Sequence, residues 1–516
     1  MAKVSRARNS IRNIGFGLIY KILALILPFI ARTVLIYYLG IQYVGLSSLF
    51  TSILSMLNLA ELGVGSAIVF SMYDAVARED KNLICGLLKV YKKVYSVIGC
   101  VILCAGLLFS PFLKNVISGE IPSDINLYVL YFIYLINTSL TYFLFAYKNC
   151  LFIANHRNDI ISKISAVVLI TQNVIQIVIL VLTKNYYLYI IWMIVGTVFN
   201  NLIVNYVSSK RFYDYIPEGH VSTEIIENIK RKVKALFLYK VGGIVLTAVD
   251  SIVISAFLGL TILGKYNNYY FIITSLFAFL AIFYDSVRPG IGNSLVLENK
   301  DKNLQDFRRL FLLNSWLVGW CTVCLVCLYE PFMEFWVGEA LTFPFSIVIL
   351  LSIYFYIWKM MEIVNLYKDA AGMWEYDKYR PIVAATINLI LNLSLVKICG
   401  IYGILISTIV AIAFVIFPWS TIVLFKHYYN DNNKNLLIYL KKYFYYTFVT
   451  IFACVITYLI CQFIQAVSII GLISRLLLCV IVPNIIYVFG FSMDKDFLGT
   501  VKWMKDKFNK NHEKIR

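Results

Sequence analysis

Long apolar segments separated by short polar ones make up almost the whole chain. Most apolar segments are about 20 residues long, which matches a helix that crosses a hydrocarbon core about 30 Å thick. Backbone groups in lipid must form their hydrogen bonds internally, so we predict helices. A transmembrane β-barrel would instead show alternating strands of about ten residues, and that pattern is absent. The pattern therefore predicts an all-α, polytopic integral membrane protein.

Fourteen apolar spans can be placed along the sequence. The first six lie near 11–38, 45–72, 94–113, 125–147, 162–182 and 187–207. The next six lie near 236–258, 266–287, 310–329, 343–366, 381–397 and 401–425. The last two lie near 443–463 and 468–492. We therefore expect 14 transmembrane helices.

A shift of 219 residues aligns two parts of the chain. It places Leu39–Gly45 (LGIQYVG) on Leu258–Gly264 (LGLTILG), with the Leu-Gly pair and the second glycine in register. The same shift places the loop NHRND, after the fourth span, on WEYDK, after the tenth. Spans 1–6 and 7–12 are therefore predicted to be two six-helix lobes, and because six is even the repeat is parallel. Transporters commonly bind their substrate between such repeats.

The repeat divides the sequence into four predicted regions. They are an N-lobe at 1–207, a cytoplasmic linker at 208–235, a C-lobe at 236–426, and two peripheral helices with a basic cytoplasmic tail at 427–516. Within the linker, TEIIENIKRKVKALF has the pattern of a short amphipathic helix on the membrane surface.

Composition and charge agree with a membrane protein. Of 516 residues, 60% are hydrophobic and 14% charged, which excludes a single water-soluble core. The net charge of +18 does not indicate a nucleic-acid partner, because the basic residues lie between the spans. Alternate segments, beginning with the N-terminus, hold 38 of the 46 Lys and Arg residues, and the intervening loops hold four. The positive-inside rule therefore predicts that both termini are cytoplasmic.

Eleven cysteines are scattered, mostly inside apolar spans, and do not predict a disulfide framework. Cys321, Cys324 and Cys327 form a C-x2-C-x2-C run, a spacing that would indicate a metal site in a soluble loop. Here the run lies in NSWLVGWCTVCLVCLYE, a predicted membrane helix. The interpretation we favour is small apolar side chains packed in a helix.

The segment Pro28–Tyr73 carries a more specific signal. It contains a Leu-Gly pair followed five residues later by Gly45, then a helix rich in serine and leucine, then AELGVGSAI. These features resemble the polysaccharide transporters, or Wzx-type flippases, of the multidrug/oligosaccharidyl-lipid/polysaccharide (MOP) exporter superfamily. The resemblance is most specific in the first hundred or so residues. Over the rest of the chain it rests on the arrangement of the apolar spans.

This resemblance implies a flippase in the bacterial cytoplasmic (inner) membrane. Its substrate would be a polyprenyl-diphosphate-linked oligosaccharide, a repeat unit of the capsule or O-antigen type, moved from the inner to the outer leaflet. The expected mechanism is ion-coupled alternating access. The expected partners are this substrate, membrane lipids and other membrane proteins of polysaccharide assembly.

Ionisable side chains inside the spans are the best functional candidates, because a charge in lipid is costly. Lys21 and Arg32 are eleven residues apart, so they lie on nearly one face of the first span, about 16 Å apart along its axis. A cationic face lining a cavity suits an anionic headgroup such as a diphosphate. The predicted cavity residues are Lys21, Arg32, Glu61, Arg288, Lys359 and Glu362.

Four of these residues have a structural alternative. Lys21 and Arg288 lie near the ends of spans, where a long side chain often reaches the interface. Lys359 and Glu362 are three residues apart and able to form an internal neutralised pair.

A second group of polar residues predicts a site for a coupling ion. Asp250 lies in the seventh span, Asn388 and Asn392 in the eleventh, and Thr408 in the twelfth. Carboxylate, amide and hydroxyl oxygens suit Na⁺, and an aspartate alone is able to carry H⁺. The resemblance implies the same place, because lipid II flippases of the superfamily have a sodium site between these helices. Interhelical hydrogen bonds from the asparagines are the alternative, and we expect no other cofactor.

No enzyme motif is found. The four histidines lie singly in predicted cytoplasmic segments, and no nucleotide-binding P-loop is present. We therefore expect a membrane transporter, not an enzyme. The alternatives are a multidrug or small-molecule cation antiporter of the same superfamily, which would favour acidic cavity residues, and a non-transporting membrane component or enzyme of the polysaccharide pathway.

Overall fold

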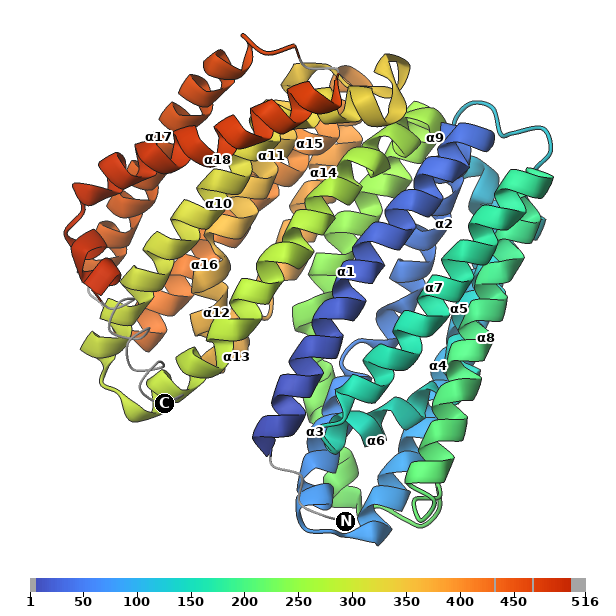
Figure 1. The fold of residues 1–516 in the computed structure, drawn as a ribbon. Helices are drawn as coiled ribbons and strands as arrows, with labels where there is room; N and C mark the ends of the chain where they lie inside the picture. The colour runs from blue at the N-terminus through green and yellow to red at the C-terminus, as the bar shows by residue number, and fades with distance from the viewer. Residues whose placement is uncertain (1–5, 431–432, 466–467, 503–516) are drawn as a thin grey trace. The chain divides into compact units, whose positions relative to one another are not determined.

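A computed structural model describes residues 6–430, 433–465 and 468–502. Throughout these residues the regular structure is helical, and no β-strand occurs among them. The chain forms two compact units, which meet in sequence between Asn268 and Tyr269 (Figure 1).

The first unit is built from long helices, several of which are interrupted by short 3-10 turns. They are α1 (Arg6–Tyr38), α2 (Ile41–Leu57), η1 (Asn58–Glu61), α3 (Val64–Ala77), α4 (Lys81–Phe109), η2 (Ser110–Val116), α5 (Leu127–Phe143), η3 (Ala146–Lys148), α6 (Asn149–Ala154), α7 (Asn158–Thr183), α8 (Tyr186–Arg211) and α9 (Thr223–Leu297), which continues into the second unit. Helix α7 packs on α1 and α8, and α5 packs on α4 and α8.

The second unit is also helical and includes two π-helical turns, η5 and η6. Its remaining elements are α10 (Lys300–Val337), η4 (Glu339–Leu341), α11 (Phe345–Met360), α12 (Glu362–Ala370), α13 (Trp374–Asp377), α14 (Arg380–Cys399), α15 (Ile401–Ala411), η5 (Ile412–Ile416), α16 (Phe417–Val423), η6 (Leu424–Tyr428), α17 (Lys434–Cys461) and α18 (Ile469–Ser492). Helix α10 packs on α11, and the last two helices, α17 and α18, pack on α10 (Figure 1).

The number of membrane spans in the structure agrees with the fourteen expected from the sequence. Among the described residues, twelve helices are long and apolar enough to cross a membrane, and the bent pair of α5 and α6 makes thirteen. One of the twelve, in α9, is interrupted at Gly259, where φ is 86° and ψ is 173°. Counting its two halves separately gives fourteen. The predicted all-α, polytopic membrane fold is therefore confirmed.

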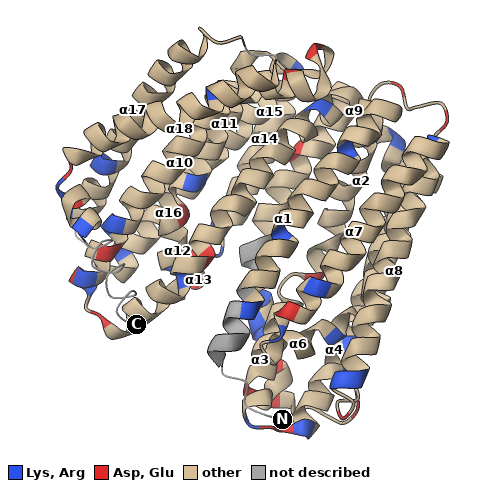
Figure 2. Ribbon diagram, in the orientation of Figure 1, with Lys and Arg blue, Asp and Glu red and all other residues tan. Residues whose placement is uncertain are grey.

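Apolar side chains cover the outer surfaces of the helices. On α17, for example, Phe444 and Phe448 are 65% and 69% exposed. Figure 2 shows that most charged residues lie near helix ends, with long uncharged stretches between them. Exposed apolar surface on this scale is unfavourable in water and is what lipid contact requires.

The internal repeat is visible in the backbone. Gly40 precedes α2 with φ 104° and ψ 172°, and Gly259, which is 219 residues later, has nearly the same angles. Residues with a Cβ rarely adopt this conformation, so glycine is required at both positions.

The second glycine of each copy permits a close helix crossing. A Cβ added at Gly45 would lie 2.2 Å from the carbonyl oxygen of Leu260, and one added at Gly264 would lie 2.4 Å from that of Ile41. Because both glycines lack a side chain, the start of α2 and the segment of α9 after Gly259 touch through their backbones. The two contacts are equivalent under the 219-residue shift.

Several predicted spans are broken inside the apolar region, which the sequence did not indicate. The second span is interrupted by η1 and by Gly63, whose φ is 88°. The fourth bends by 46° between α5 and α6, and the tenth breaks at Met361 between α11 and α12. Phe143, the last residue of α5, aligns with Glu362, the first of α12, so these two breaks occur at the same place in the repeat.

The predicted linker helix also differs from expectation. It begins at Thr223 and runs without interruption into the seventh span as part of α9, so it is not a separate surface helix. The predicted division into lobes at 207 and 236 stays a prediction.

Candidate functional site

Arg32 lies on α1, one turn after Pro28, inside the first span. Its Nη2 donates to Oδ1 of Asn267 at 2.7 Å, and its Nη1 donates to the carbonyl oxygen of Asn267 at 3.1 Å and to Oδ1 of Asn268 at 3.3 Å. Asn267 in turn donates to Oγ of Ser48 on α2 at 2.6 Å. These bonds position the guanidinium between α1 and the segment of α9 after Gly259.

The other two basic candidates outside the tenth span lie in different surroundings. Lys21 is half-buried on α1. The side chain of Arg288, near the C-terminal end of α9, is 56% exposed, with Nη2 3.9 Å from Oδ1 of the equally exposed Asp285. Such an exposed pair contributes little stability. For Arg288, the geometry agrees best with the alternative of an interfacial residue.

Glu61 ends η1, where the second span is broken, and accepts hydrogen bonds from two tyrosines. The hydroxyl of Tyr95 on α4 donates to Oε1 at 2.6 Å, and that of Tyr142 on α5 donates to Oε2 at 2.7 Å. Tyr91 extends the network by donating to the hydroxyl of Tyr95 at 2.8 Å. The carboxylate is thus fixed between three helices of the first unit, in a setting the sequence did not predict.

Lys359 and Glu362 form the ion pair that their spacing predicts. Nζ of Lys359 is 3.3 Å from Oε2 of Glu362, across the break between α11 and α12. The ammonium also lies over the rings of Phe277 and Tyr284, with 4.4 Å and 5.5 Å to their centroids. Asn314 donates to the carbonyl oxygen of Lys359 at 3.1 Å, next to the break. Charge, rings and amide therefore hold this break in one conformation.

The predicted ion-site residues of the second unit lie together. Nδ2 of Asn388 on α14 donates to Oγ1 of Thr408 on α15 at 3.0 Å, and Nδ2 of Asn392 donates to Oδ1 of Asn388 at 3.2 Å. Both asparagines are fully buried. Asp250 is buried on α9 in the first unit. A site that joins Asp250 to these three residues stays a prediction.

The structure also contains a buried ionic cluster that sequence reasoning missed. Lys368 on α12 and Asp377 on α13 are both fully buried and in direct contact. Arg380 on α14 adds a second cation, with Nε 2.9 Å from Oδ1 of Asp377. Ser420 on α16 accepts hydrogen bonds from both cations, at 3.3 Å from Lys368 and 2.6 Å from Arg380. The cluster ties four helices together around one carboxylate.

The first unit has a comparable anchor at the start of α7. Asp159 is buried and lies 2.9 Å from Nε of Arg12 on α1 and 3.0 Å from Nε of Arg157. Asn13 accepts from the backbone N–H of Asp159 at 2.9 Å. Asp159 and Asp377 belong to NHRND and WEYDK, the two loops that the repeat aligns, so each loop supplies a buried aspartate. The i, i+3 spacing of Asp377 and Arg380 was the available sequence signal.

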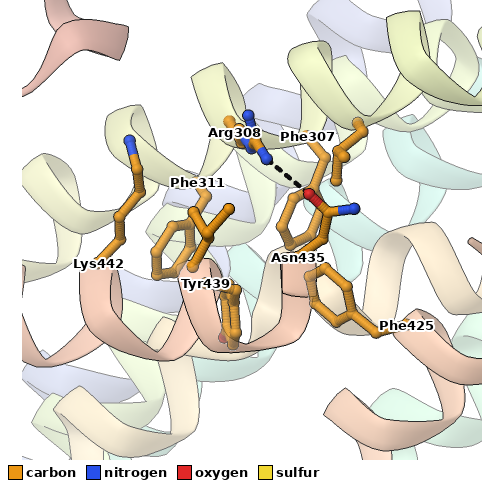
Figure 3. A pocket seen from close by; sticks show the side chains of 9 residues that line it. Phe307, Arg308, Phe311, Phe425, Asn435, Tyr439 and Lys442 are labelled. Atoms are coloured by element: carbon orange, nitrogen blue, oxygen red, sulfur yellow. Dashed lines mark hydrogen bonds between the residues drawn. The ribbon is translucent and has the colours of Figure 1, made fainter. Parts of the chain in front are cut away.

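One small aromatic pocket lies between α10 and α17 (Figure 3). It is lined by Leu304, Phe307, Arg308, Phe311, Phe425, Asn435, Ile438, Tyr439 and Lys442, and Arg308 donates to Asn435 at 2.9 Å. Its volume of about 10 Å³ accommodates at most one water molecule. This pocket is therefore packing space and not a substrate site.

One family model and several solved structures match this chain. A family model described as polysaccharide biosynthesis protein matches residues 10–287. No curated protein matches in sequence. An inward-facing multidrug resistance MATE family transporter of the MOP superfamily has a TM-score of 0.55 and 13% identity, over 77% of this chain and 93% of its own. A mutant of the Vibrio cholerae MATE transporter VcmN has a TM-score of 0.55 and 12% identity, over 83% and 98%. Such low identities show a common fold and nothing finer.

Proposed function

Because the chain belongs to the polysaccharide biosynthesis protein family and has the fold of MOP-superfamily transporters, we propose that it is a flippase for a polyprenyl-diphosphate-linked oligosaccharide. The family match over residues 10–287 carries the proposal. The glycan is a repeat unit of the capsule or O-antigen type, moved from the inner to the outer leaflet of the bacterial cytoplasmic membrane. Other membrane proteins of polysaccharide assembly are the partners expected on either side of this step.

The charge inside the first span supports an anionic cargo. Arg32 is held by neutral amide and carbonyl oxygens, and a guanidinium offers forked donors that match a phosphate. In the proposed mechanism the headgroup enters the protein while the polyprenyl chain stays in lipid. Alternating access then exposes the headgroup to each side of the membrane in turn.

Ion coupling is part of the proposal, and each unit offers a different chemistry. In the second unit, the buried amide and hydroxyl oxygens of Asn388, Asn392 and Thr408 are suitable ligands for Na⁺. In the first unit, the carboxylates of Asp250 and Glu61 are suitable carriers of H⁺.

A second candidate function is export of small organic cations. Glu61, with Tyr95 and Tyr142 around it, favours this candidate, because a carboxylate beside aromatic rings attracts a cation. The fold shared with MATE transporters is compatible with both functions.

Leaflet exchange in proteoliposomes tests the proposal directly. A fluorescent polyprenyl-diphosphate oligosaccharide is incorporated, and its exchange is measured with and without an imposed Na⁺ or H⁺ gradient. We expect gradient-stimulated exchange by the wild-type protein. Arg32→Gln should lower the rate about tenfold or more, because a charge-assisted bond to phosphate contributes about 1.5–3 kcal/mol.

Arg78→Gln is the matched control. Arg78 pairs with Asp74 on an exposed helix surface and should leave exchange unchanged. Arg32→Gln protein must first show wild-type elution and thermal unfolding in detergent. Failure of the wild type to exchange any lipid-linked glycan, together with uptake of a cationic dye, would reject the flippase and favour the second candidate.

A further inference from the structure

Three buried cysteines from three helices meet in the second unit. They are Cys327 on α10, Cys461 at the end of α17 and Cys479 on α18, and their Sγ atoms all lie within 4.8 Å of one another. Each side chain is fully buried. Of the C-x2-C-x2-C run, Cys327 belongs to this group and the Cys324 thiol contacts Cys479, so the cluster coincides only partly with the run that the sequence spacing suggested.

The geometry of the thiols is close to that of a three-coordinate site. Thiolate sulfurs about 2.3 Å from one ion lie about 4 Å apart when the ion is in their plane. Small side-chain rotations would therefore bring all three sulfurs to bonding distance. The helices are held near each other independently, because Trp320 Nε1 on α10 donates to the carbonyl oxygen of Cys479 at 2.8 Å.

A buried cation beside the thiols gives a second, independent observation. Arg475 lies one turn before Cys479 on α18 and is 7% exposed. Its Nη2 donates to the carbonyl oxygen of Ile464 at 2.8 Å, while its Nε has no hydrogen-bond partner in the described part of the chain. The guanidinium is therefore a buried positive charge on the turn of α18 next to Cys479. A buried guanidinium favours thiolates, which are the metal-binding form of cysteine.

An apolar groove lies on the same two helices, α10 and α18. It has a volume of about 360 Å³ and is lined on α10 by Cys324 and Leu328, and on α18 by Ile473 and Leu476, with further apolar residues around them. The residues from α18 flank Arg475, on the turns that lead to Cys479.

We propose that Cys327, Cys461 and Cys479 bind one Cu(I) ion, which fastens the last two helices to α10. Soft thiolate ligands select Cu(I), and three sulfurs suit its low coordination number. Binding releases the thiol protons to solvent. Arg475 offsets part of the negative charge of the copper-thiolate group.

Copper binding to the purified protein in detergent tests this proposal. Cu(I) is supplied under anaerobic, reducing conditions in competition with a chromogenic chelator, and copper per chain is measured after gel filtration. We expect about one Cu(I) per wild-type chain and at least a tenfold weaker affinity in Cys461→Ser and Cys479→Ser. Cys399→Ser, which alters an exposed cysteine, is the control and should bind as the wild type does.

Two further readouts are independent of transport. Cu(I) should raise the thermal unfolding midpoint of the wild type and not that of Cys479→Ser. X-ray absorption at the copper edge, recorded on the wild-type protein, should show about three sulfur neighbours around copper. This measurement does not depend on whether any variant folds. Nitrogen or oxygen neighbours, absence of bound copper, or equal binding by Cys479→Ser would each overturn the proposal.

Discussion

Asp377 is a single buried carboxylate that balances two buried cations, Lys368 and Arg380. Removing its charge leaves both cations in a site without water. We expect Asp377→Asn to lower the free energy of unfolding by about 3–5 kcal/mol, the usual cost of breaking a buried ion pair. Thermal unfolding of the purified protein in detergent measures the change.

Glu375→Gln provides the comparison for Asp377→Asn. Glu375 belongs to the same short helix but pairs with Lys378 at the surface, where it is 80% exposed. Its loss should change the unfolding midpoint very little, because exposed pairs contribute about 0–1 kcal/mol. Equal effects of the two substitutions would show that Asp377 contributes no more than a surface charge.

The sequence predicted some of the ion pairs and hydrogen bonds at these sites and not others. The Lys359–Glu362 pair was predicted, because side chains three positions apart lie on the same side of a helix. The contact of Lys368 with Asp377 was not, because the two residues lie nine positions apart on different helices. Glu61 was recognised as a candidate, yet its tyrosine partners are 34 and 81 residues away, so no local pattern announces them.

Among the helices, the glycine crossing of α2 and α9 gives a sharp test. A Cβ at Gly45 would lie 2.2 Å from the backbone oxygen of Leu260. A backbone atom cannot relieve this clash by a change of rotamer, as a side chain does. We expect Gly45→Ala to lower the free energy of unfolding by about 1–3 kcal/mol, the cost typical of overpacking. Gly264→Ala should have a similar effect.

Gly243→Ala is the matched control for these glycines. Gly243 lies in α9 with nothing within 4 Å of an added Cβ. Alanine is the better helix former by up to about 1 kcal/mol, so this substitution should be neutral or stabilising. If Gly45→Ala protein unfolds at the wild-type midpoint, α2 and α9 are able to move apart without a loss of stability.

The α17–α18 pair depends on a carboxylate just beyond α18. Asp494 accepts from Nζ of Lys442 at 2.7 Å and from the hydroxyl of Tyr446 at 2.5 Å, both on α17. Burial by itself would raise the pKa of Asp494, but the bonds from Lys442 and Tyr446 outweigh it and the pKa lies below its ordinary value. The carboxylate therefore stabilises the folded state above the unfolded pKa of about 4, and that contribution is lost as the pH falls through the lower folded-state pKa.

Asp494→Asn tests this linkage. At pH 7 the variant should be less stable than the wild type by about 1–3 kcal/mol, because a buried charged acceptor is lost. The difference should shrink as the pH falls below about 4. Thermal unfolding across this pH range measures it, with the exposed Asp74→Asn as control. A difference that does not depend on pH would rule out the charge of Asp494 as its source.

At the scale of elements, apolar length predicted the spans but not their breaks. Each of these apolar spans is long enough to be one straight helix, so length does not mark the break at Met361 or the bend near Phe145. Tertiary contacts such as the bond from Asn314 to Lys359 lie at these positions and join residues far apart in sequence. The glycines were informative, because Gly40 and Gly259 are required by backbone conformation itself.

For the whole molecule, the distribution of Lys and Arg predicts orientation. A green fluorescent protein fused after residue 516 should fluoresce, because that end is expected in the cytoplasm. Fused within the predicted outer loop near 114–124, the same reporter should stay dark, and alkaline phosphatase there should be active. The reverse pattern at both sites would invert the proposed topology.

The fold as a whole could be predicted from the sequence because lipid restricts the choice to helices, and because the repeat fixes how many there are. The ionic clusters, the tyrosines around Glu61 and the thiol cluster could not, since each joins helices that are distant in sequence. Cys327, Cys461 and Cys479 come from three different spans. No spacing rule connects them.

The unbroken start of α9 has a mechanical consequence. From Thr223 to Leu258 the helix is continuous, which at 1.5 Å per residue gives a rod about 54 Å long. Most of its first turns are exposed, whereas its far end stops at the glycine hinge of Gly259. A continuous helix resists bending, so the chain from Thr223 to Leu258 is a stiff connection and not a slack tether.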